Sequence, residues 1–393
     1  MSSPYTVRWG IMATGGIAET FCKDLLTDPS IRGVNDVKHE IVAVASSRSA
    51  DGAANFVKRI DGPASAKTYG SYADLVADPA VDIVYVATPH SHHFQNAMLC
   101  LEAGKNVLCE KAFTVTVAQT KKLVETAKAK NLFLMEAVWT RYFPLSTKVR
   151  ELITSGAIGK VYRTMADLSF SSSKPDGTLD FDPSNRMINS DLAGGALLDL
   201  GIYSLTWVFQ TLYHTQQQPA REAPKVVAAI NKYPATGVDE QTSIICQWPQ
   251  SNLMGIATTN LRVSTDPDGK HTAGPAIRIQ GSEGEIQVYA PAYRPLKYRV
   301  VRKDSDGKAE TVDCPIPSDP ERGGWGHGMF WEADECARCL RDGRKESETM
   351  PWSESIAIMQ TMDEALAQGG VVYPELITTH VYDAKSPLNK GNQ

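Results

Sequence analysis

Short apolar runs alternate with helical patterns along the first third of the sequence. The clearest run is the nearly continuous apolar stretch Val81–Ala87. The predicted strands are Val7–Met12, Ile41–Ala45, Val81–Ala87, Asn106–Cys109 and Leu132–Ala137, and the predicted helices are Ile17–Leu26, Ala53–Ile60, Phe94–Ala103 and Val117–Lys130. Such alternation predicts a parallel sheet with helices on both faces. Residues 1–138 are therefore predicted to form an α/β domain.

After Val138 the pattern changes to many strand-like runs with few helices between them. The predicted strands are Val161–Phe170, Val226–Tyr233, Thr242–Trp248, Met254–Leu261, Ile277–Gln280, Glu285–Tyr289 and Tyr298–Lys303, and the predicted helices are Leu145–Ile153, Trp331–Arg341 and Ser353–Ala367. Turn signals at Pro267–Gly269 and Ser305–Gly307 separate some of the strands. We predict an α+β domain over residues 139–393 with a largely antiparallel open sheet, whose terminal helices could pack back on the first domain.

Composition supports a globular protein of two domains. The chain has 393 residues, 42% of them hydrophobic and 22% charged. A net charge of -5 argues against nucleic acid or an anionic membrane as partner, and no segment is expected to approach the length of a membrane span. Seven cysteines and an N-terminus without a signal-peptide pattern predict a cytoplasmic protein with reduced thiols. The pair Cys336 and Cys339 is interpreted as core helix residues, rather than a redox or zinc motif.

The first predicted strand leads into a glycine turn and a helix, the context of a dinucleotide-binding site. The run Ala13–Ala18 is close to the fingerprint G-x-G-x-x-G/A, except that Ala13 replaces its first glycine. Glycines there let the backbone approach a pyrophosphate that rests on the helix N-terminus. We therefore predict a Rossmann domain whose cofactor contacts include Thr14, Gly15, Gly16 and Ile17.

The end of the second strand predicts the choice of cofactor. Ser46, Ser47 and Arg48 stand where an NAD enzyme usually places an acid for the ribose 2′-hydroxyl. Two hydroxyls and a guanidinium suit the 2′-phosphate of NADP, which an acid would repel. The alternative interpretation is an ordinary polar loop.

Two further strand ends are expected to line the same crevice. The strand Val81–Ala87 is followed by Thr88-Pro89-His90-Ser91-His92-His93, and the next strand by Glu110-Lys111-Ala112. We predict cofactor contacts from Thr88, Pro89, His90, His93 and Glu110, and a functional role for Lys111 whose alternative is a solvated surface lysine. No metal is predicted, because three histidines at this spacing in a loop match no zinc pattern and no cysteine or acid completes a set.

In the second domain a glycine turn at Gly194–Gly195 leads into an apolar helical run. Asp199 and Tyr203 are four residues apart, so they share one face of a helix. An aspartate in an apolar run is costly unless it is paired. A structural cap or a buried hydrogen bond would explain Asp199 alone. A functional pair, in which Asp199 orients and Tyr203 exchanges a proton, explains both residues.

Taken together, these motifs resemble the glucose-fructose oxidoreductase/inositol dehydrogenase family, abbreviated Gfo/Idh/MocA, over essentially the whole chain. The run Met135–Pro144 (MEAVWTRYFP) resembles the dimeric dihydrodiol dehydrogenase branch, and the overall sequence is most similar to fungal NADP-dependent sugar dehydrogenases of that branch. The family's usual motif is Glu-Lys-Pro, and here Ala112 replaces the proline. That replacement leaves open the geometry of the peptide bond after Lys111.

The resemblance implies a reaction and roles for named residues. It implies oxidation of D-xylose, and of related aldoses, at C1 to the aldonolactone, with catalysis by Lys111, Asp199 and Tyr203 and with His93 near the substrate or nicotinamide. The expected contacts with the sugar are Trp139, Arg141, Tyr142 and Phe143, for which interdomain packing is the alternative. Two other functions stay open, a trans-1,2-dihydrodiol dehydrogenase and a non-catalytic NADP-binding regulator. The open sheet of the second domain predicts a homodimer.

Overall fold

The computed structural model describes residues 3–216, 221–303, 306 and 308–390. The predicted turn Ser305–Gly307 therefore lies largely outside the described residues. The chain forms two compact units. The first unit is Met1–Trp139 with Ile316–Ser355 and Glu375–Gln393, and the second is Thr140–Pro315 with Ile356–Pro374. Both stretches of the second unit are thus insertions between parts of the first unit.

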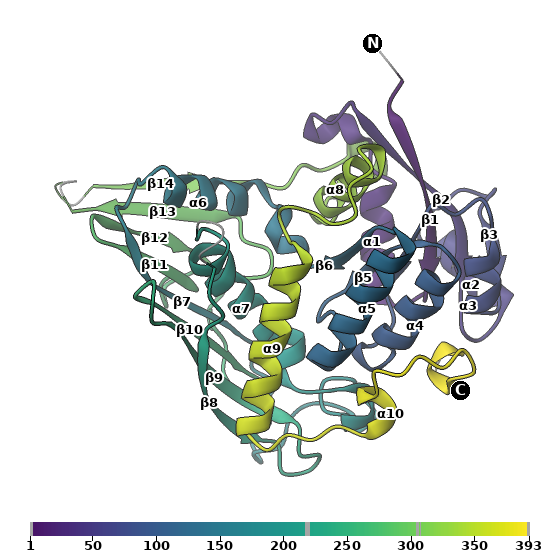
Figure 1. Cartoon of the computed structure of the whole chain (residues 1–393). Coiled ribbons are helices and arrows are strands. Elements are labelled where there is room, and N and C mark those ends of the chain that lie inside the picture. Colours follow the sequence, from purple (N-terminus) through teal and green to yellow (C-terminus); the bar gives the residue numbers. More distant parts are fainter. Residues whose placement is uncertain (1–2, 217–220, 304–305, 307, 391–393) are drawn as a thin grey trace. The chain divides into compact units, whose positions relative to one another are not determined.

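A parallel sheet forms the centre of the first unit, as the sequence predicts, and it has six strands where five were predicted (Figure 1). Its order is β3-β2-β1-β4-β5-β6, the order of a doubly wound dinucleotide-binding sheet. The strands are β1 (Tyr5–Met12), β2 (Val37–Ala45), β3 (Lys67–Tyr69), β4 (Ile83–Val86), β5 (Asn106–Glu110) and β6 (Leu134–Ala137). The edge strand β3 was not predicted, because it has three residues, none of them buried.

Helices cover both faces of this sheet. They are α1 (Gly16–Leu25), α2 (Ala50–Arg59), α3 (Tyr72–Ala77), α4 (His90–Glu102), α5 (Val117–Lys130), α8 (Phe330–Arg341) and the short α10 (Glu375–Thr378). Right-handed crossovers put the helices that follow β1 and β4 on opposite faces, because the strand order runs in opposite directions from these two strands. Accordingly α1 packs against α8, whereas α4 packs against α3 and α5.

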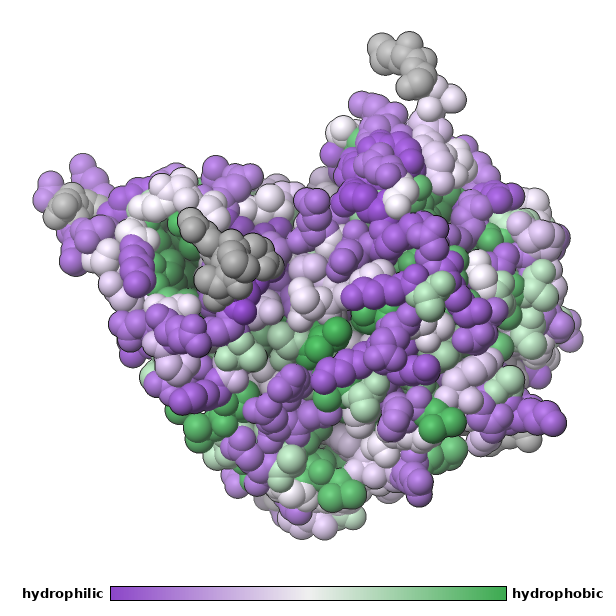
Figure 2. Space-filling view, in the orientation of Figure 1, coloured by the Kyte–Doolittle hydropathy of each residue, from purple (hydrophilic) through white to green (hydrophobic). Residues whose placement is uncertain are grey.

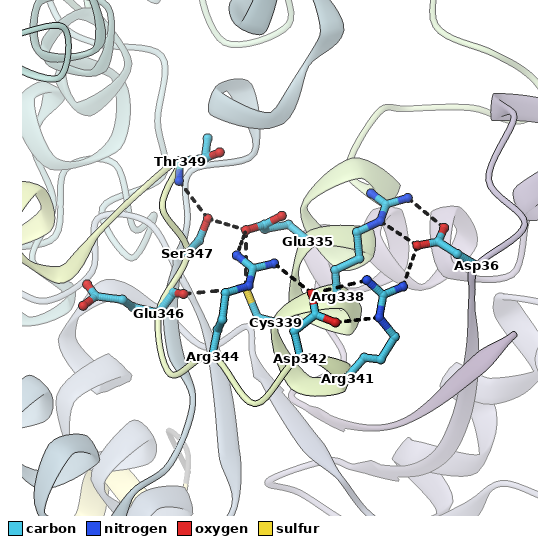
Figure 3. Close-up of polar contacts among 10 residues, drawn as sticks. All are labelled: Asp36, Glu335, Arg338, Cys339, Arg341, Asp342, Arg344, Glu346, Ser347 and Thr349. Carbon is cyan, nitrogen blue, oxygen red and sulfur yellow. Dashed lines mark hydrogen bonds and ion pairs between the residues drawn. The ribbon is translucent and has the colours of Figure 1, made fainter.

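Two ionic clusters fasten α8 to the segment that precedes β2. At the surface, Arg338 makes two 3.0 Å hydrogen bonds to Asp36, and Arg341 adds one of 2.8 Å (Figure 3). In the interior, Arg32 binds both carboxylate oxygens of Asp334 on α8 at 2.8 Å, and both side chains are about 1% exposed. Residues from the far end of the chain are therefore part of the first unit.

An eight-stranded sheet forms the second unit, in the order β14-β13-β12-β11-β7-β10-β9-β8 (Figure 1). Its strands are β7 (Val161–Ser169), β8 (Lys225–Lys232), β9 (Asp239–Trp248), β10 (Leu253–Asn260), β11 (Ile277–Gly281), β12 (Gly284–Val288), β13 (Lys297–Arg302) and β14 (Ala309–Asp313). All neighbouring pairs in the described sheet are antiparallel except β10 with β7, which confirms the predicted α+β architecture. The short, mostly polar edge strand β14 was not predicted.

Three helices belong wholly or mainly to this unit. They are α6 (Pro144–Thr154), α7 (Ile202–Val208) and α9 (Trp352–Gln368), whose first residues belong to the first unit. The segment Leu197–Gly201 before α7 and the segment Phe209–Tyr213 after it are π-helical. This helical run packs on β7 and β10.

The run Ser190–Tyr213 is also long and apolar enough to cross a membrane by length and composition alone. The expectation that no segment approaches the length of a membrane span is therefore wrong on that criterion. However, 94% of its most apolar window is buried inside the protein, so the run is the central core helix of the second unit.

Candidate functional site

The carboxyl ends of four strands, β1, β2, β4 and β5, meet at one edge of the sheet in the first unit. Met12 pairs with both Ala45 and Val86, so β1, β2 and β4 end in register. Val86 pairs in turn with Cys109 of β5. The cofactor contacts predicted for the first unit lie at the ends of these strands, in the loops that follow them, or in the first turns of α1 and α4. The topology brings these segments to one edge of the sheet. A crevice at this edge is where open parallel sheets bind ligands.

The turn between β1 and α1 has the shape of a pyrophosphate site. Gly15 is the N-cap of α1, and no side chain of the described residues caps the helix there. A side chain added at Gly15 or Gly16 would meet no described atom within 4 Å, so the backbone surface is open. Ala13 has a φ of 84°, a left-handed conformation that explains why the fingerprint places glycine there. An uncapped helix N-terminus behind an open backbone fits a phosphate group.

The loop after β2 presents two of its three predicted contacts outward. Arg48 is exposed and Ser47 is half-buried, and both precede the N-terminus of α2. Ser46 is buried, and its hydroxyl accepts a hydrogen bond of 3.3 Å from the Arg48 backbone N–H. Ser46 therefore shapes the loop, whereas Ser47 and Arg48 are the side chains placed to meet a phosphate.

The histidines after β4 lie in a helix rather than in the predicted loop. Helix α4 begins at His90, four residues before the predicted start, because Pro89 can stand before a first helical turn without losing a hydrogen bond. The ring nitrogens of His93 lie 2.8 Å from the Thr88 carbonyl oxygen and 2.9 Å from that of Ala112. Burial lowers the pKa of His93 to about 4. A neutral ring carries one N–H, so it donates to one of the two carbonyl oxygens and only contacts the other. His93 thus links the loop after β4 to the loop after β5.

The side-chain hydroxyl of Thr88 is a candidate ligand contact. Its Oγ1 is buried, and among the described residues it has no hydrogen-bond partner. A buried hydroxyl without a partner is costly, so this position fits a polar group supplied by a ligand. Pro89 and the edge-on pair His90 and His93, with ring centroids 5.6 Å apart, complete this part of the crevice.

The segment after β5 places Glu110 inward and Lys111 at the edge. The buried Glu110 accepts a hydrogen bond from the Tyr85 hydroxyl and a second one, of 3.2 Å, from the Lys111 backbone N–H. Lys111 itself is half-buried. The Lys111–Ala112 peptide bond is cis, which answers the question raised by the missing proline.

A glycine-rich segment next to Trp139 was missed by sequence reasoning. His327 stacks on Trp139 with ring centroids 4.9 Å apart, in the run Gly323–Gly328 (GGWGHG). The buried Asp24 of α1 holds this run, since it accepts hydrogen bonds from Trp325 Nε1, His327 N, Met329 N and Phe330 N at 2.6–3.2 Å. The sequence feature that could have revealed this segment is its composition, four glycines and two aromatic residues in six positions.

No metal centre emerges from the described residues, in which no group of three or more histidine, cysteine or acidic side chains could hold an ion. Cys336 and Cys339 are buried, and burial raises the pKa of both thiols. Thiols held protonated are poor nucleophiles and poor metal ligands. The interpretation of this pair as core helix residues is confirmed.

In the second unit, Asp199 lies in the π-helical turn Leu197–Gly201 and is 7% exposed. Its carboxylate binds Arg186, with Nη1 2.7 Å from Oδ1. The sequence predicted that this acid needs a partner. It did not identify Arg186, because the arginine lies in the irregular segment after β7. π-Helical turns are frequent at functional sites.

Tyr203 follows on the next turn and is 6% exposed, with its ring centroid 5.8 Å from that of Tyr293. Two hydrogen bonds fix its helix, from Ser204 Oγ to the Thr258 carbonyl and from Trp207 Nε1 to the Ala292 carbonyl, both 2.8 Å long. The phenol is thus carried by a rigid element.

The three predicted sugar contacts in this unit differ in exposure. Arg141 and Phe143 are buried, and Tyr142 is half-buried. Arg141 Nη2 lies 3.2 Å from His214 Nδ1, which must accept because a guanidinium only donates. Within this unit, Arg141 and Phe143 have the burial expected of the packing alternative.

Fold and sequence together define an oxidoreductase with a nucleotide-binding domain. Residues 7–138 match the family described as "Oxidoreductase family, NAD-binding Rossmann fold", and residues 146–287 match the "GFO/IDH/MocA C-terminal domain". The chain belongs to the Gfo/Idh/MocA oxidoreductase family.

Among its relatives is a D-xylose 1-dehydrogenase (NADP(+)) of Hypocrea jecorina, 71% identical over 392 residues that cover 100% of this chain and 99% of the relative. The human trans-1,2-dihydrobenzene-1,2-diol dehydrogenase is 33% identical over 371 residues, or 94% of this chain and 98% of that protein. A levoglucosan dehydrogenase solved with NADH and levoglucosan shares the fold, with a TM-score of 0.76 at 18% identity, covering 93% of this chain and 97% of the other.

Proposed function

We propose that this protein is an NADP-dependent dehydrogenase that oxidises D-xylose, and related aldoses, at C1 to the aldonolactone. The observation that carries the proposal is 71% identity to a D-xylose 1-dehydrogenase (NADP(+)) over the full length of both chains. Identity to the dihydrodiol dehydrogenases is less than half as high, at 32–35%. We therefore prefer the sugar as substrate to a dihydrodiol.

The proposed cofactor contacts follow from the crevice in the first unit. The uncapped start of α1 with Gly15 and Gly16 would hold the pyrophosphate, and Ser47 with Arg48 would hold the 2′-phosphate. The unpartnered hydroxyl of Thr88 would meet a polar group of the same ligand. The nicotinamide, when bound, supplies the hydride acceptor at its C4.

The proposed chemistry is removal of the C1 hydroxyl proton as the hydride leaves. Tyr203 takes that proton, Lys111 supplies a positive charge, and Asp199 orients the phenol. A tyrosine with the ordinary pKa of about 10 is a poor base at neutral pH, and a neighbouring ammonium favours the phenolate. The buried, hydrogen-bonded setting of the helix that carries Asp199 and Tyr203 supports this assignment, since acid–base groups require fixed positions.

Trp139, Tyr142, Phe143 and Arg141 are proposed as further determinants of the sugar pocket. Trp139 belongs to the unit that carries the proposed cofactor contacts, and His327 stacks on its ring. Aromatic faces suit the C–H groups of a pyranose ring.

The test is NADPH formation from a panel of aldoses and from a trans-dihydrodiol, with NADP and with NAD, using wild type and Tyr203→Phe. We expect the highest kcat/KM with D-xylose and NADP, and a loss of at least about 100-fold in kcat in the variant, with NADP binding retained. Faster turnover of the dihydrodiol would reassign the substrate. NADP binding without turnover of any substrate would instead indicate a non-catalytic regulator.

We also propose a homodimer formed through the sheet of the second unit. Val227, Ile245, Ile256 and Met165 are successive cross-strand neighbours on β8, β9, β10 and β7, and therefore share one face. Val227 and Ile245 are 63% and 40% exposed. A row of apolar side chains on an open sheet favours burial against a second copy. Size-exclusion chromatography with light scattering tests this, and a monomeric mass would reject it.

We also propose a cytoplasmic location, without nucleic acid or membrane as partner. The seven cysteines are free thiols in the structure, and six of them are buried. The surface shown in Figure 2 is mostly hydrophilic, with scattered hydrophobic patches. Cell fractionation tests the location.

A further inference from the structure

Asp239, the first residue of β9, is a fully buried acid that the chemistry above does not use. Its Oδ2 accepts a hydrogen bond of 2.7 Å from the backbone N–H of Leu197 and one of 2.9 Å from the hydroxyl of Thr242. Leu197 begins the π-helical turn that contains Asp199. The carboxylate of a distant strand therefore caps the helix that carries Asp199 and Tyr203.

The turn before this helix is built around the same carboxylate. Gly195 has a φ of 125°, and a side chain there would place its Cβ 2.0 Å from Asp239 Oδ1. The Tyr373 hydroxyl donates a hydrogen bond of 2.6 Å to the Gly194 carbonyl. Gly195 must therefore leave room for Asp239, and a side chain at Gly194 would place its Cβ 2.8 Å from the Arg186 carbonyl oxygen.

We propose that Asp239 is a positioning residue for the reaction, which fixes the first turn of the helix through the Leu197 N–H and thereby sets the positions of Asp199 and Tyr203. The inference rests on the proposed function, because it takes those two residues as the groups that act on the substrate. Leu197, Asp199 and Tyr203 lie in one unbroken helical run, so a shift in its first turn moves both side chains.

The charge state of Asp239 bears on this role. The groups that face it are the Leu197 and Ala196 amides, the Thr242 hydroxyl of its own strand and the Tyr373 phenol. None of these is a cation, and the adjacent Glu240 is already paired with Arg262 at 2.6 Å. Burial without a counter-charge raises the pKa of Asp239 to about 6. Below that pH the carboxylate is neutralised and becomes a weaker acceptor for the helix cap.

The test compares wild type with Asp239→Asn, which keeps the shape of the side chain and removes its ionisation. We expect wild-type kcat with D-xylose and NADP to fall as the pH drops through about 6. In Asp239→Asn we expect a kcat three- to tenfold lower than in wild type at pH 8, and a KM for D-xylose within twofold of wild type. The fall in kcat through pH 6 that Asp239 causes should be absent from this variant. The matched control is Asp268→Asn, an exposed acid of the same unit that accepts the Lys270 backbone N–H at 2.8 Å. The control should match wild type.

A second readout does not depend on turnover. Amide hydrogen exchange over residues 197–203 at pH 8 should be at least threefold faster in Asp239→Asn than in wild type and in Asp268→Asn. Faster exchange with no turnover in any of the three proteins would reject the proposed function, and would leave standing only that Asp239 fixes the first turn of the helix. Wild-type kcat, wild-type pH dependence and unchanged exchange in Asp239→Asn would overturn the role of Asp239.

Discussion

The indole N–H of Trp9 donates a 3.1 Å hydrogen bond to Nδ1 of His39 in the core of the first unit. An indole only donates, so Nδ1 carries no proton and Nε2 must carry it. Nε2 then donates to Asp334, at 2.9 Å. The chain thus fixes His39 in one neutral tautomer between an indole and a carboxylate.

This arrangement predicts a loss of stability in mild acid. Burial lowers the pKa of His39 from its ordinary value of about 6.5, so between pH 6.5 and the lower folded pKa the unfolded chain binds a proton that the folded chain does not. The free energy of unfolding should therefore fall as the pH drops below about 6.5. Urea unfolding at pH 7.5, 6.5 and 5.5 measures it. The pH dependence should shrink in His39→Asn and stay unchanged in a variant of the exposed His380, His380→Asn.

Replacing Ala13 by glycine should improve the pyrophosphate turn. A φ of 84° costs an alanine about 1 kcal/mol, and part of this gain is offset by the greater chain entropy of glycine. We expect Ala13→Gly to raise the free energy of unfolding by up to about 1 kcal/mol and to bind NADP at least as tightly. Ala54→Gly inside α2 is the control, and it should lose about 1 kcal/mol. A destabilised Ala13→Gly protein would contradict the argument.

Arg48 should decide between NADP and NAD. Loss of a charge-assisted hydrogen bond to phosphate costs about 1.5–3 kcal/mol, which corresponds to a loss of about tenfold or more in kcat/KM with NADP. Arg48→Ala should therefore lower the NADP/NAD preference by that factor, measured by steady-state kinetics. Lys58→Ala at the other end of α2 should leave the preference unchanged. An unaltered preference in Arg48→Ala would place the 2′-phosphate elsewhere.

Asp24 should be among the most sensitive positions of the first unit. Asp24→Ala would leave the four N–H groups of the segment 325–330 without this acceptor, and buried donors left unsatisfied cost about 1–3 kcal/mol each. We expect a loss of at least about 3 kcal/mol in urea unfolding, with a smaller loss for Asp24→Asn. Asp28→Asn, at an exposed cap, should lose no more than about 1 kcal/mol. A loss below about 1 kcal/mol in Asp24→Ala would show that the segment is held by other contacts.

The sequence predicted what depends on periodicity and missed what depends on tertiary contacts. Helix α5 was predicted to the residue, because Thr116 caps its start and its pattern is regular. The short elements β3 and α3 have too few residues to show a period.

The same division holds for the candidate site. The sequence predicted that Thr14, Ser47 and Lys111 lie at one edge of the sheet, because each follows a parallel strand and the topology alone decides where such residues lie. Three features could not be predicted, because loop geometry or packing decides which residues come together. They are the buried orientation of the Ser46 side chain, the Arg186–Asp199 ion pair and the hydrogen bond by which Asp239 caps the helix.

The first unit is built from three separate stretches of chain, and this has a consequence for biosynthesis. Its sheet is complete once residue 137 has been made, yet α8 (Phe330–Arg341), which packs on β1 and β2, is made only after residues 140–315. On the ribosome the nascent sheet must keep that surface uncovered while Thr140–Pro315, the larger part of the second unit, emerges. Chaperone binding to nascent chains should therefore persist until synthesis passes Arg341.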